Sequence, residues 1–159
     1  MIELAKVNDL LQVVHNATLA REHMIENGLN QWQGDYPNLS HFQNDFDQKA
    51  LYIYKKENNI LGSISLFKDR EAAYSKITWI KKHSLVMHRV IVSPIAQHQG
   101  IGTQLFTFAI DFAKNQGYES VKVDTHPDNS KMQNLILKMG FQYIGYLSGI
   151  NRLAYEFIL

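Results

Sequence analysis

The sequence predicts an α/β fold built on one mixed, mostly antiparallel central sheet flanked by helices. Several strand-like segments before about residue 80 follow one another directly, which is typical of antiparallel pairs. Between about residues 85 and 124 a strand, a helix and a second strand follow in turn, and this order requires a parallel, right-handed crossover. Hydrophobic residues make up 45% of the 159 residues and charged residues 19%, as in globular domains with a packed core.

The first half of the chain combines two helix signals with β-branched and aromatic runs. A helix is predicted to begin at Asn8 or Asp9, which are good N-caps, and to end near Gly28 because glycine favours a C-terminal stop. A short second helix is predicted from a Ser40 cap to about residue 48. Residues 51–56 and 60–67 are predicted to pair as a hairpin. The extended segments predicted here are residues 2–6, 51–56, 60–67 and 74–80.

The second half begins with an apolar, β-branched central strand that ends at Ser93-Pro94, because proline cannot donate to a ladder. Apolar residues then recur at helical spacing until Gly117, which predicts an amphipathic helix. A turn that doubles as a helix cap precedes the last helix, which Gly140 ends. The predicted elements are strands over residues 85–92, 120–125, 141–146 and 152–159, and helices over about 103–116 and 130–139.

Composition excludes several classes of function. Lysine and arginine number 16 and aspartate and glutamate 15, so the net charge of +1 gives no reason to expect nucleic acid or an anionic membrane as a partner. The absence of cysteine excludes disulfides and a thiolate nucleophile, and the seven histidines show no metal-ligand spacing. No signal-peptide pattern and no run of roughly 20 apolar residues is found. We therefore predict a cytoplasmic protein with a single domain over residues 1–159 and no metal.

A loop with two glycines joins the central strand to the following helix. The first turn of a helix carries unpaired N–H groups and the positive end of the macrodipole. Gly100 and Gly102, at the entrance of this helix, allow the backbone to approach a ligand closely. A phosphate or diphosphate suits such a site, although a Gly-x-Gly alone is more often a tight turn.

Two stretches together resemble the GNAT-type (Gcn5-related) N-acetyltransferases. The first is Gln97-His98-Gln99-Gly100-Ile101-Gly102, between a strand and a helix. The second, about 27 residues further on, contains Asn129, Met132, Leu135 and Gly140-Phe141 at the family's spacing. The resemblance covers roughly residues 85–146, and the order of the flanking elements agrees with it.

This resemblance implies acetyl-CoA as the cofactor and an amine as the acceptor. In the family, loop amides hold the diphosphate and the central strand pairs with the pantetheine arm like an added strand. Carried over by position, Asn129 would hydrogen-bond the pantetheine. The diphosphate would bind the amides of Gln97, His98, Gln99, Gly100, Ile101, Gly102 and Thr103. The pantetheine amides would pair with backbone groups of Val90, Ile91 and Val92.

Acetyl transfer from a thioester to an amine needs alignment and a base that removes the ammonium proton. His88, four residues before Val92 on the central strand, is our candidate base. Serotonin N-acetyltransferases, which are similar here, have a histidine at the matching position. The alternative is that His88 is a buried histidine with a structural role. Val86 stands where histone-acetylating relatives have glutamate. Ile136 stands where many family members have a tyrosine that acts as the general acid. In this chain Tyr143, Tyr146 or water would then protonate the leaving thiolate. The resemblance implies direct transfer without an acyl-enzyme, and the absence of cysteine is consistent with that.

Trp32 and Tyr36 are large aromatics in a loop without periodicity. The resemblance makes them candidates for the acceptor pocket, because this region often lines it in the family. For Trp32 the alternative is a residue that pins the loop to the core. Asp124, at a strand end, would meet the amine or cap a turn. We expect His98 and His126 to be solvent-exposed loop residues.

The acceptor is predicted to be a small-molecule amine, with protein N-terminal or lysine acetylation and a non-catalytic acyl-CoA-binding domain as alternatives. A homodimer is possible.

Overall fold

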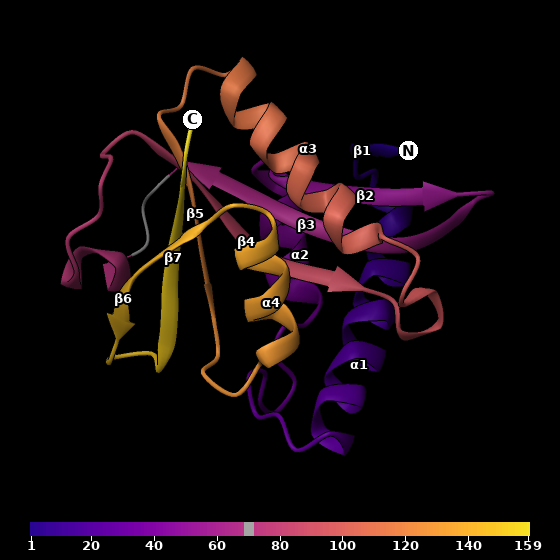
Figure 1. Cartoon of the computed structure of the whole chain (residues 1–159). Coiled ribbons are helices and arrows are strands. Elements are labelled where there is room, and N and C mark those ends of the chain that lie inside the picture. Colours follow the sequence, from indigo (N-terminus) through magenta and orange to yellow (C-terminus); the bar gives the residue numbers. More distant parts are fainter. Residues whose placement is uncertain (69–71) are drawn as a thin grey trace. The chain divides into compact units, whose positions relative to one another are not determined.

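The computed structural model describes residues 1–68 and 72–159, whose helices and strands are shown in Figure 1. The chain divides into two compact units, the first with Met1–Leu66 and His88–Leu105 and the second with Phe67–Met87 and Phe106–Leu159. The strands are β1 (Ile2–Leu4), β2 (Leu51–Lys56), β3 (Asn59–Lys68), β4 (Ser84–Val92), β5 (Ser120–Thr125), β6 (Gln142–Leu147) and β7 (Arg152–Ile158). The α-helices are α1 (Leu10–Glu26), α2 (Leu39–Asp47), α3 (Ile101–Asn115) and α4 (Ser130–Lys138), and the 3-10 turns are η1 (Val7–Asp9), η2 (Ala72–Lys76) and η3 (Pro94–Ala96).

The strands form a seven-stranded sheet in the order β1-β2-β3-β4-β5-β7-β6. β4 and β5 run parallel, whereas β1 and β2, β2 and β3, β5 and β7, and β6 and β7 are antiparallel pairs. The chain between β4 and β5 contains α3, so the predicted strand–helix–strand crossover is present. The predicted mixed, mostly antiparallel α/β fold is thus confirmed.

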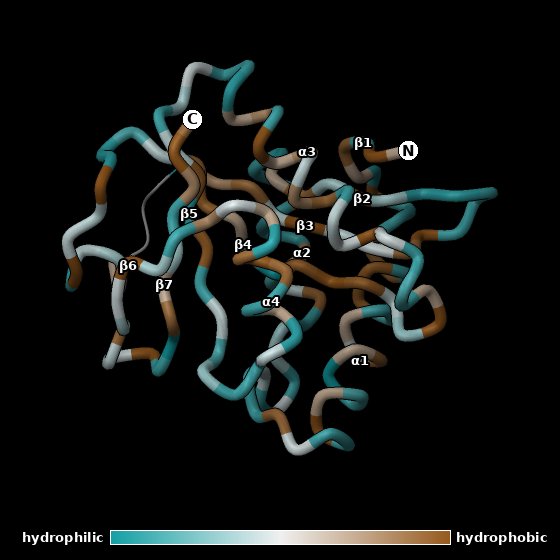
Figure 2. The backbone as a smooth tube through the Cα atoms, viewed as in Figure 1, coloured by the Kyte–Doolittle hydropathy of each residue, from teal (hydrophilic) through white to brown (hydrophobic). Residues whose placement is uncertain are grey.

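The first unit is organised on the β2–β3 hairpin. Leu51 pairs with Ser65 at one end and Lys56 with Asn59 at the other. The turn between the strands is hydrophilic (Figure 2), and its residues Glu57 and Asn58 have positive φ. The hairpin, α1 and α2 share one apolar core. The buried residues of this core are Ala5, Leu10, Val13, Ala17, Ala20, Trp32, Phe42, Leu51, Ile53, Ile60 and Ile91.

The second unit is organised on β5. One edge of β5 forms a parallel ladder with the start of β4, in which Ser84 pairs with Ser120. Its other edge pairs with β7 from Ser120 to Thr125. Tyr74, Val86, Leu147 and Ala154 are buried together, with Ile77 and Trp79 packed against them.

Three glycines end helices as predicted. Gly28, Gly117 and Gly140 follow α1, α3 and α4 with φ of 75°, 76° and 92°, the left-handed conformation that closes a helix. The start of α2 differs by two residues from the prediction: the cap is Asn38, whose side-chain oxygen accepts a hydrogen bond from the Ser40 N–H at 2.9 Å. Asparagine is as good an N-cap as serine, and local sequence alone does not rank the two.

The prediction of an extended segment over residues 74–80 is wrong. The 3-10 turn η2 occupies its first part. The indole N–H of Trp79 donates to the Tyr74 carbonyl at 2.8 Å, and the Ile80 and Lys81 N–H groups donate to the buried carboxylate of Glu156 at 2.8 and 3.0 Å. Side chains thus satisfy backbone groups that a strand would have given to a ladder.

Among the helices in residues 1–68 and 72–159, none is both long and apolar enough to cross a membrane. The longest of them, α1, has 17 residues. Within the same described part of the chain, no group of three or more His, Cys, Asp or Glu side chains is arranged to hold a metal ion.

We predict that alanine at Gly62 destabilises the protein. A Cβ built on Gly62 in β3 would lie 2.9 Å from the Ile91 carbonyl oxygen and 2.9 Å from Ile101 Cγ2. Because the oxygen belongs to the backbone and cannot rotate away, we expect Gly62→Ala to lower the free energy of unfolding by about 1–3 kcal/mol. Urea denaturation followed by circular dichroism measures this change.

Gly145→Ala is the matched control for this substitution. Gly145 also lies in a strand, but its Cβ would meet only Ile77 side-chain atoms, the nearest at 3.7 Å, which is ordinary van der Waals contact. We expect this variant to be neutral or up to about 0.5 kcal/mol more stable, since alanine loses less conformational entropy than glycine. Equal losses in the two variants would contradict the prediction.

Candidate functional site

The segment between β4 and α3 makes a tight, ordered turn. The Ser93 N–H donates to the Leu61 carbonyl at 2.9 Å, and the Ala96 N–H donates to the Ser93 carbonyl at 2.8 Å, which closes η3. Two further residues, His98 and Gly100, have left-handed backbone with φ of 62° and 74°. These two conformations turn the chain directly into the first residue of α3.

The N-terminus of α3 suits an anion. The backbone hydrogen bond of its first turn runs from the Gln104 N–H to the Gly100 carbonyl at 3.1 Å, so the N–H groups of residues 101–103 precede the helical ladder. A Cβ built on Gly100 would meet no atom within 4 Å, which shows open space beside the backbone at this point. His98 and Gln99 are exposed and Gln97 is half-buried, so the loop also faces solvent. Diphosphate oxygens fit such donors and the positive end of the helix dipole.

His88 lies in β4, on the strand that leads into this loop. It is half-buried, as are Val90 and Val92, whereas Ile91 is buried in the core of the first unit. The first unit therefore contains the candidate base, the three strand residues predicted to pair with pantetheine, and the whole glycine loop. Their roles in binding and catalysis stay predictions.

Arg89, next to His88, is a feature of the site that the sequence reasoning missed. Its backbone is left-handed, with φ of 51°, although it lies inside a strand. One guanidinium nitrogen, Nη1, donates to both carboxylate oxygens of Asp45 in α2, at 2.9 and 2.7 Å. Asp45 is fully buried and also accepts a hydrogen bond from the Ser65 hydroxyl at 2.6 Å. No local pattern marks Arg89 or Asp45, because their pairing joins residues 44 apart in sequence.

The two aromatic residues of the α1–α2 loop have different environments. Trp32 is 6% exposed and belongs to the apolar core of the first unit, which agrees with the pinning alternative. Tyr36 is exposed, with its ring edge-on to His41 and 5.7 Å from the Arg89 guanidinium carbon. The Tyr36 carbonyl accepts a hydrogen bond from Arg21 at 3.3 Å. Of the two, Tyr36 is the residue that offers surface to an acceptor.

In the second unit, Asp124 lies near the carboxyl end of β5. The hydroxyl of Tyr74 donates to its carboxylate at 2.6 Å, and Arg152 Nε lies 3.7 Å from the other oxygen. The carboxylate is therefore compensated by a hydroxyl and a cation. An amine beside Asp124 would therefore meet a carboxylate that already interacts with the Tyr74 hydroxyl and with Arg152.

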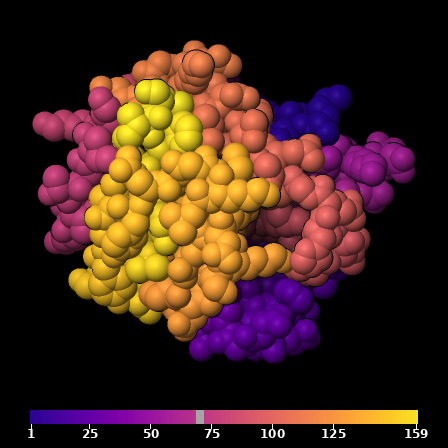
Figure 3. Space-filling view, in the orientation of Figure 1, coloured from indigo at the N-terminus to yellow at the C-terminus, as the bar shows by residue number. Residues whose placement is uncertain are grey.

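Asn129 has a clear structural role at the start of α4. Its side-chain oxygen accepts a hydrogen bond from the Met132 N–H at 3.1 Å, so Asn129 is the N-cap of this helix. Residues 130, 131, 134, 137 and 138 of α4 are exposed, and the helix lies at the surface in the view of Figure 3. In the predicted contact with pantetheine, the carboxamide of Asn129 would therefore both bind pantetheine and cap α4.

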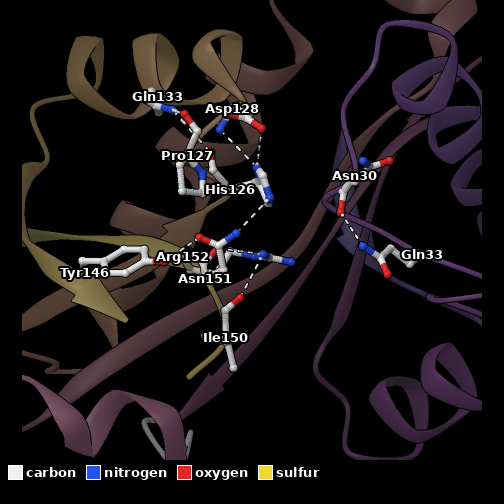
Figure 4. A network of polar contacts seen from close by, with 10 residues as sticks. All are labelled: Asn30, Gln33, His126, Pro127, Asp128, Gln133, Tyr146, Ile150, Asn151 and Arg152. Carbon is white, nitrogen blue, oxygen red and sulfur yellow. Dashed lines mark hydrogen bonds and ion pairs between the residues drawn. The ribbon is translucent and has the colours of Figure 1, made fainter. Parts of the chain in front are cut away.

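The prediction for His98 is confirmed, whereas that for His126 is wrong: His98 is exposed but His126 is only 9% exposed. Figure 4 shows its ring between the α4 cap and the β6–β7 turn. Its Nδ1 accepts a hydrogen bond from the Asp128 N–H at 3.1 Å, and its Nε2 lies 3.4 Å from Nδ2 of Asn151.

The candidate proton donors differ in exposure. Ile136 is fully buried, as an apolar residue on the inner face of α4 should be. Tyr146 is 48% exposed and donates from its hydroxyl to Asn151 at 2.7 Å, beside His126 (Figure 4). Tyr143 is also exposed and lies edge-on to Tyr155. Burial is the main cause that raises the pKa of Tyr155 above its ordinary value, and the nearby phenol of Tyr143 raises it further. The phenol of Tyr155 therefore stays protonated at neutral pH.

Comparison with known proteins gives a family and a fold. A model of the acetyltransferase (GNAT) family matches residues 16–141. An acetyltransferase candidate from Staphylococcus aureus Mu50 is 30% identical over 99% of this chain and 98% of that chain, with a TM-score of 0.79. A GNAT-family acetyltransferase from Streptococcus agalactiae 2603 is 25% identical over 100% of this chain and 95% of that chain, with a TM-score of 0.89.

The PaiA N-acetyltransferase of Thermoplasma acidophilum, solved in complex with coenzyme A, has the same fold at 15% identity. Its TM-score is 0.80, over 100% of this chain and 98% of that chain. A search of the curated proteins finds no match to the sequence.

We predict that Asn129 contributes to stability through its cap. Asn129→Ala removes the acceptor for the Met132 N–H and should lower the free energy of unfolding by about 0.5–2 kcal/mol. Asn129→Asp keeps an acceptor oxygen at the same place and should retain nearly all of the stability. Urea denaturation of both variants without any ligand measures the difference, and equal losses would show that the cap does not stabilise α4.

Proposed function

Because the chain belongs to the GNAT acetyltransferase family, we propose that it is an acetyl-CoA-dependent N-acetyltransferase (EC 2.3.1) that acetylates a primary amine of a small molecule directly. The family match contains residues of both compact units, which supports a single N-acetyltransferase domain over residues 1–159. Acetyl-CoA as the cofactor is in keeping with the coenzyme A complex of the Thermoplasma acidophilum neighbour.

The observation that carries the proposal is the turn between β4 and α3. Left-handed residues at His98 and Gly100, open space at Gly100 and the first-turn amides of α3 together support a diphosphate as the ligand of this turn. The amides of residues 97–103 would bind the diphosphate, and the backbone of residues 90–92 would pair with the pantetheine amides. Asn129 would contribute a side-chain hydrogen bond.

His88 is proposed as the base of the reaction. Acetyl-CoA supplies an acetyl group on a thioester, which is reactive enough for a neutral amine to take it directly as the C–S bond breaks. Tyr143, Tyr146 or water would supply the proton for the leaving thiolate. An ammonium group has no lone pair for attack, so an imidazole nitrogen of His88 would accept its proton first. Imidazole titrates near neutral pH and can release this proton to water after each turnover. The chain contains no cysteine, which favours direct transfer over an acyl-enzyme.

The α1–α2 loop supports a small acceptor. Trp32 is buried in the core, the Tyr36 carbonyl is bound by Arg21, and Asn38 caps α2. A loop fixed at three points leaves less room for an extended peptide than an open groove would. In this proposal Tyr36 would line the acceptor pocket and Trp32 would hold its loop to the core of the first unit. Asp124, in the second unit, stays a predicted contact of the amine.

We expect the diphosphate site to be sensitive to charge at Gly100. Gly100→Asp places a carboxylate next to the first-turn amides, where it would compete with the diphosphate. Isothermal titration with acetyl-CoA should show micromolar-range binding for the wild-type protein and a loss of at least about 100-fold for the variant. Wild-type protein that does not bind acetyl-CoA would overturn the proposed cofactor.

Gly117→Asp is the matched control. Gly117 follows the other end of α3 with φ of 76°, nearly the same as the 74° of Gly100, and a Cβ on either residue would meet no atom within 4 Å. Both variants therefore carry the same backbone strain, and only Gly100→Asp adds charge at the proposed site. Equal losses of affinity in the two variants would assign the effect to strain.

We expect His88→Ala to lower kcat by about 10²–10⁴-fold, because it removes the base, while the affinity for acetyl-CoA stays within about two-fold. The measurement is release of free CoA with a panel of small primary amines, peptides with free N-termini and lysine peptides. Turnover on peptides alone would favour a protein acceptor. Acetyl-CoA binding without turnover on any amine would favour a non-catalytic acyl-CoA-binding domain.

A further inference from the structure

Within the described residues, Arg89 is the one residue with left-handed backbone inside a β-strand. The other residues with positive φ lie in turns or at helix ends, where this conformation is common. A left-handed residue leaves the extended conformation and interrupts the alternation of side chains between the two faces of a sheet, as a bulge does, and we call this point of β4 the β4 bulge. The bulge directly follows His88, the candidate base.

The side chain of Arg89 fixes this bulge to α2. Nη1 of Arg89 bonds both oxygens of Asp45, and Asp45 is held in turn by the Ser65 hydroxyl from β3. The Asp45 side chain is 0% exposed and that of Arg89 is 16% exposed. A short, buried, charge-assisted contact of this kind holds its two partners in one geometry.

The same residue has features that work against stability. Left-handed backbone is unfavourable for a residue with a Cβ. Nε of Arg89 is buried and has no hydrogen-bond partner in the part of the chain that the structure describes. Both ions of the pair are also withdrawn from water. Strain and desolvation that coincide at one residue beside a candidate catalytic group are typical of a functional constraint.

We propose that Arg89 is a positioning residue, which, anchored by Asp45, holds the β4 bulge so that the His88 imidazole meets the acceptor amine. This inference rests on the proposed function, because it assigns a task to His88. Arg89 touches neither substrate nor cofactor in this proposal and acts through His88.

Arg89 also connects the base to the acceptor loop. Its guanidinium carbon lies 5.7 Å from the centre of the Tyr36 ring, within the range of a cation–π contact. A change of Tyr36 on binding an acceptor therefore reaches the residue that holds the bulge. This link lies within the first unit and consists of the Tyr36–Arg89 contact and the peptide bond that joins Arg89 to His88.

The test removes the anchor and follows His88 by two methods. Arg89→Met removes the cation and should lower kcat by about 10- to 100-fold, as expected for a small misplacement of a reacting group, with KM for acetyl-CoA within about two-fold. In the His88→Ala background the same substitution should cause no further loss, because its effect passes through the missing imidazole. Arg89→Gln, which removes the cation but keeps a side-chain donor opposite Asp45, replaces Arg89→Met if that variant does not fold.

Lys55→Met is the matched control, because Lys55 also pairs with a buried aspartate of the first unit, Asp9, at 3.4 Å. This variant should leave kcat unchanged. Unchanged kcat in the folded Arg89 variant, or an equal loss in the wild-type and His88→Ala backgrounds, would overturn the proposal.

The second method does not need activity. In protein with ¹³C-labelled histidine, the Cε1 signal of His88 should move in the Arg89 variant and stay in place in Lys55→Met. An unmoved signal in the Arg89 variant overturns the positioning role even if the enzyme is active. A moved signal in a protein with no turnover on any amine supports the positioning role and rejects the proposed transferase function.

Discussion

The buried contact between Arg89 and Asp45 is the interaction on which the candidate site depends. It joins α2 to β4 at the residue where the strand leaves regular geometry. Left-handed backbone is unfavourable for a residue with a Cβ, and the hydrogen bonds from the guanidinium to Asp45 offset this cost. The strand then leads through Ser93 into the turn before α3, so its path sets where the loop amides begin. In our proposal this ion pair of the first unit would hold β4 in place between the candidate base and the candidate diphosphate site.

Elements set by short-range physics were predictable from the sequence. The β2–β3 hairpin follows from alternation and a polar turn, and the helix ends at Gly28, Gly117 and Gly140 follow from left-handed closure. The loop before α3 was also recognisable, because its glycines come between a β-branched run and an amphipathic helix. Each of these signals lies within a few residues of its effect. The fold class and the diphosphate site depend mainly on such signals.

Features set by contacts between distant segments could not be predicted. Asp45 has the sequence context of an exposed helical acid, but Arg89 and Ser65 bury it. His126 follows a strand like an ordinary loop residue, but the Asp128 N–H and Asn151 enclose its ring. Residues 74–80 are rich in β-formers, yet the Glu156 carboxylate accepts hydrogen bonds from the Ile80 and Lys81 N–H groups, which a strand would have used. In each case a polar side chain from elsewhere in the chain decides the local conformation.

The cofactor and the acceptor place different demands on the chain. In the proposed function the diphosphate and pantetheine are bound by backbone groups, so the fold itself provides most of that site. In the same proposal the acceptor would be bound by side chains of the α1–α2 loop, where Trp32 belongs to the core and Tyr36 is exposed. Substitutions at an exposed position such as Tyr36 change the acceptor surface at little cost to the core. Because the Tyr36 ring lies 5.7 Å from the Arg89 guanidinium carbon, such substitutions would also act on the proposed positioning residue, and acceptor choice and catalytic geometry would then be joined at one side chain.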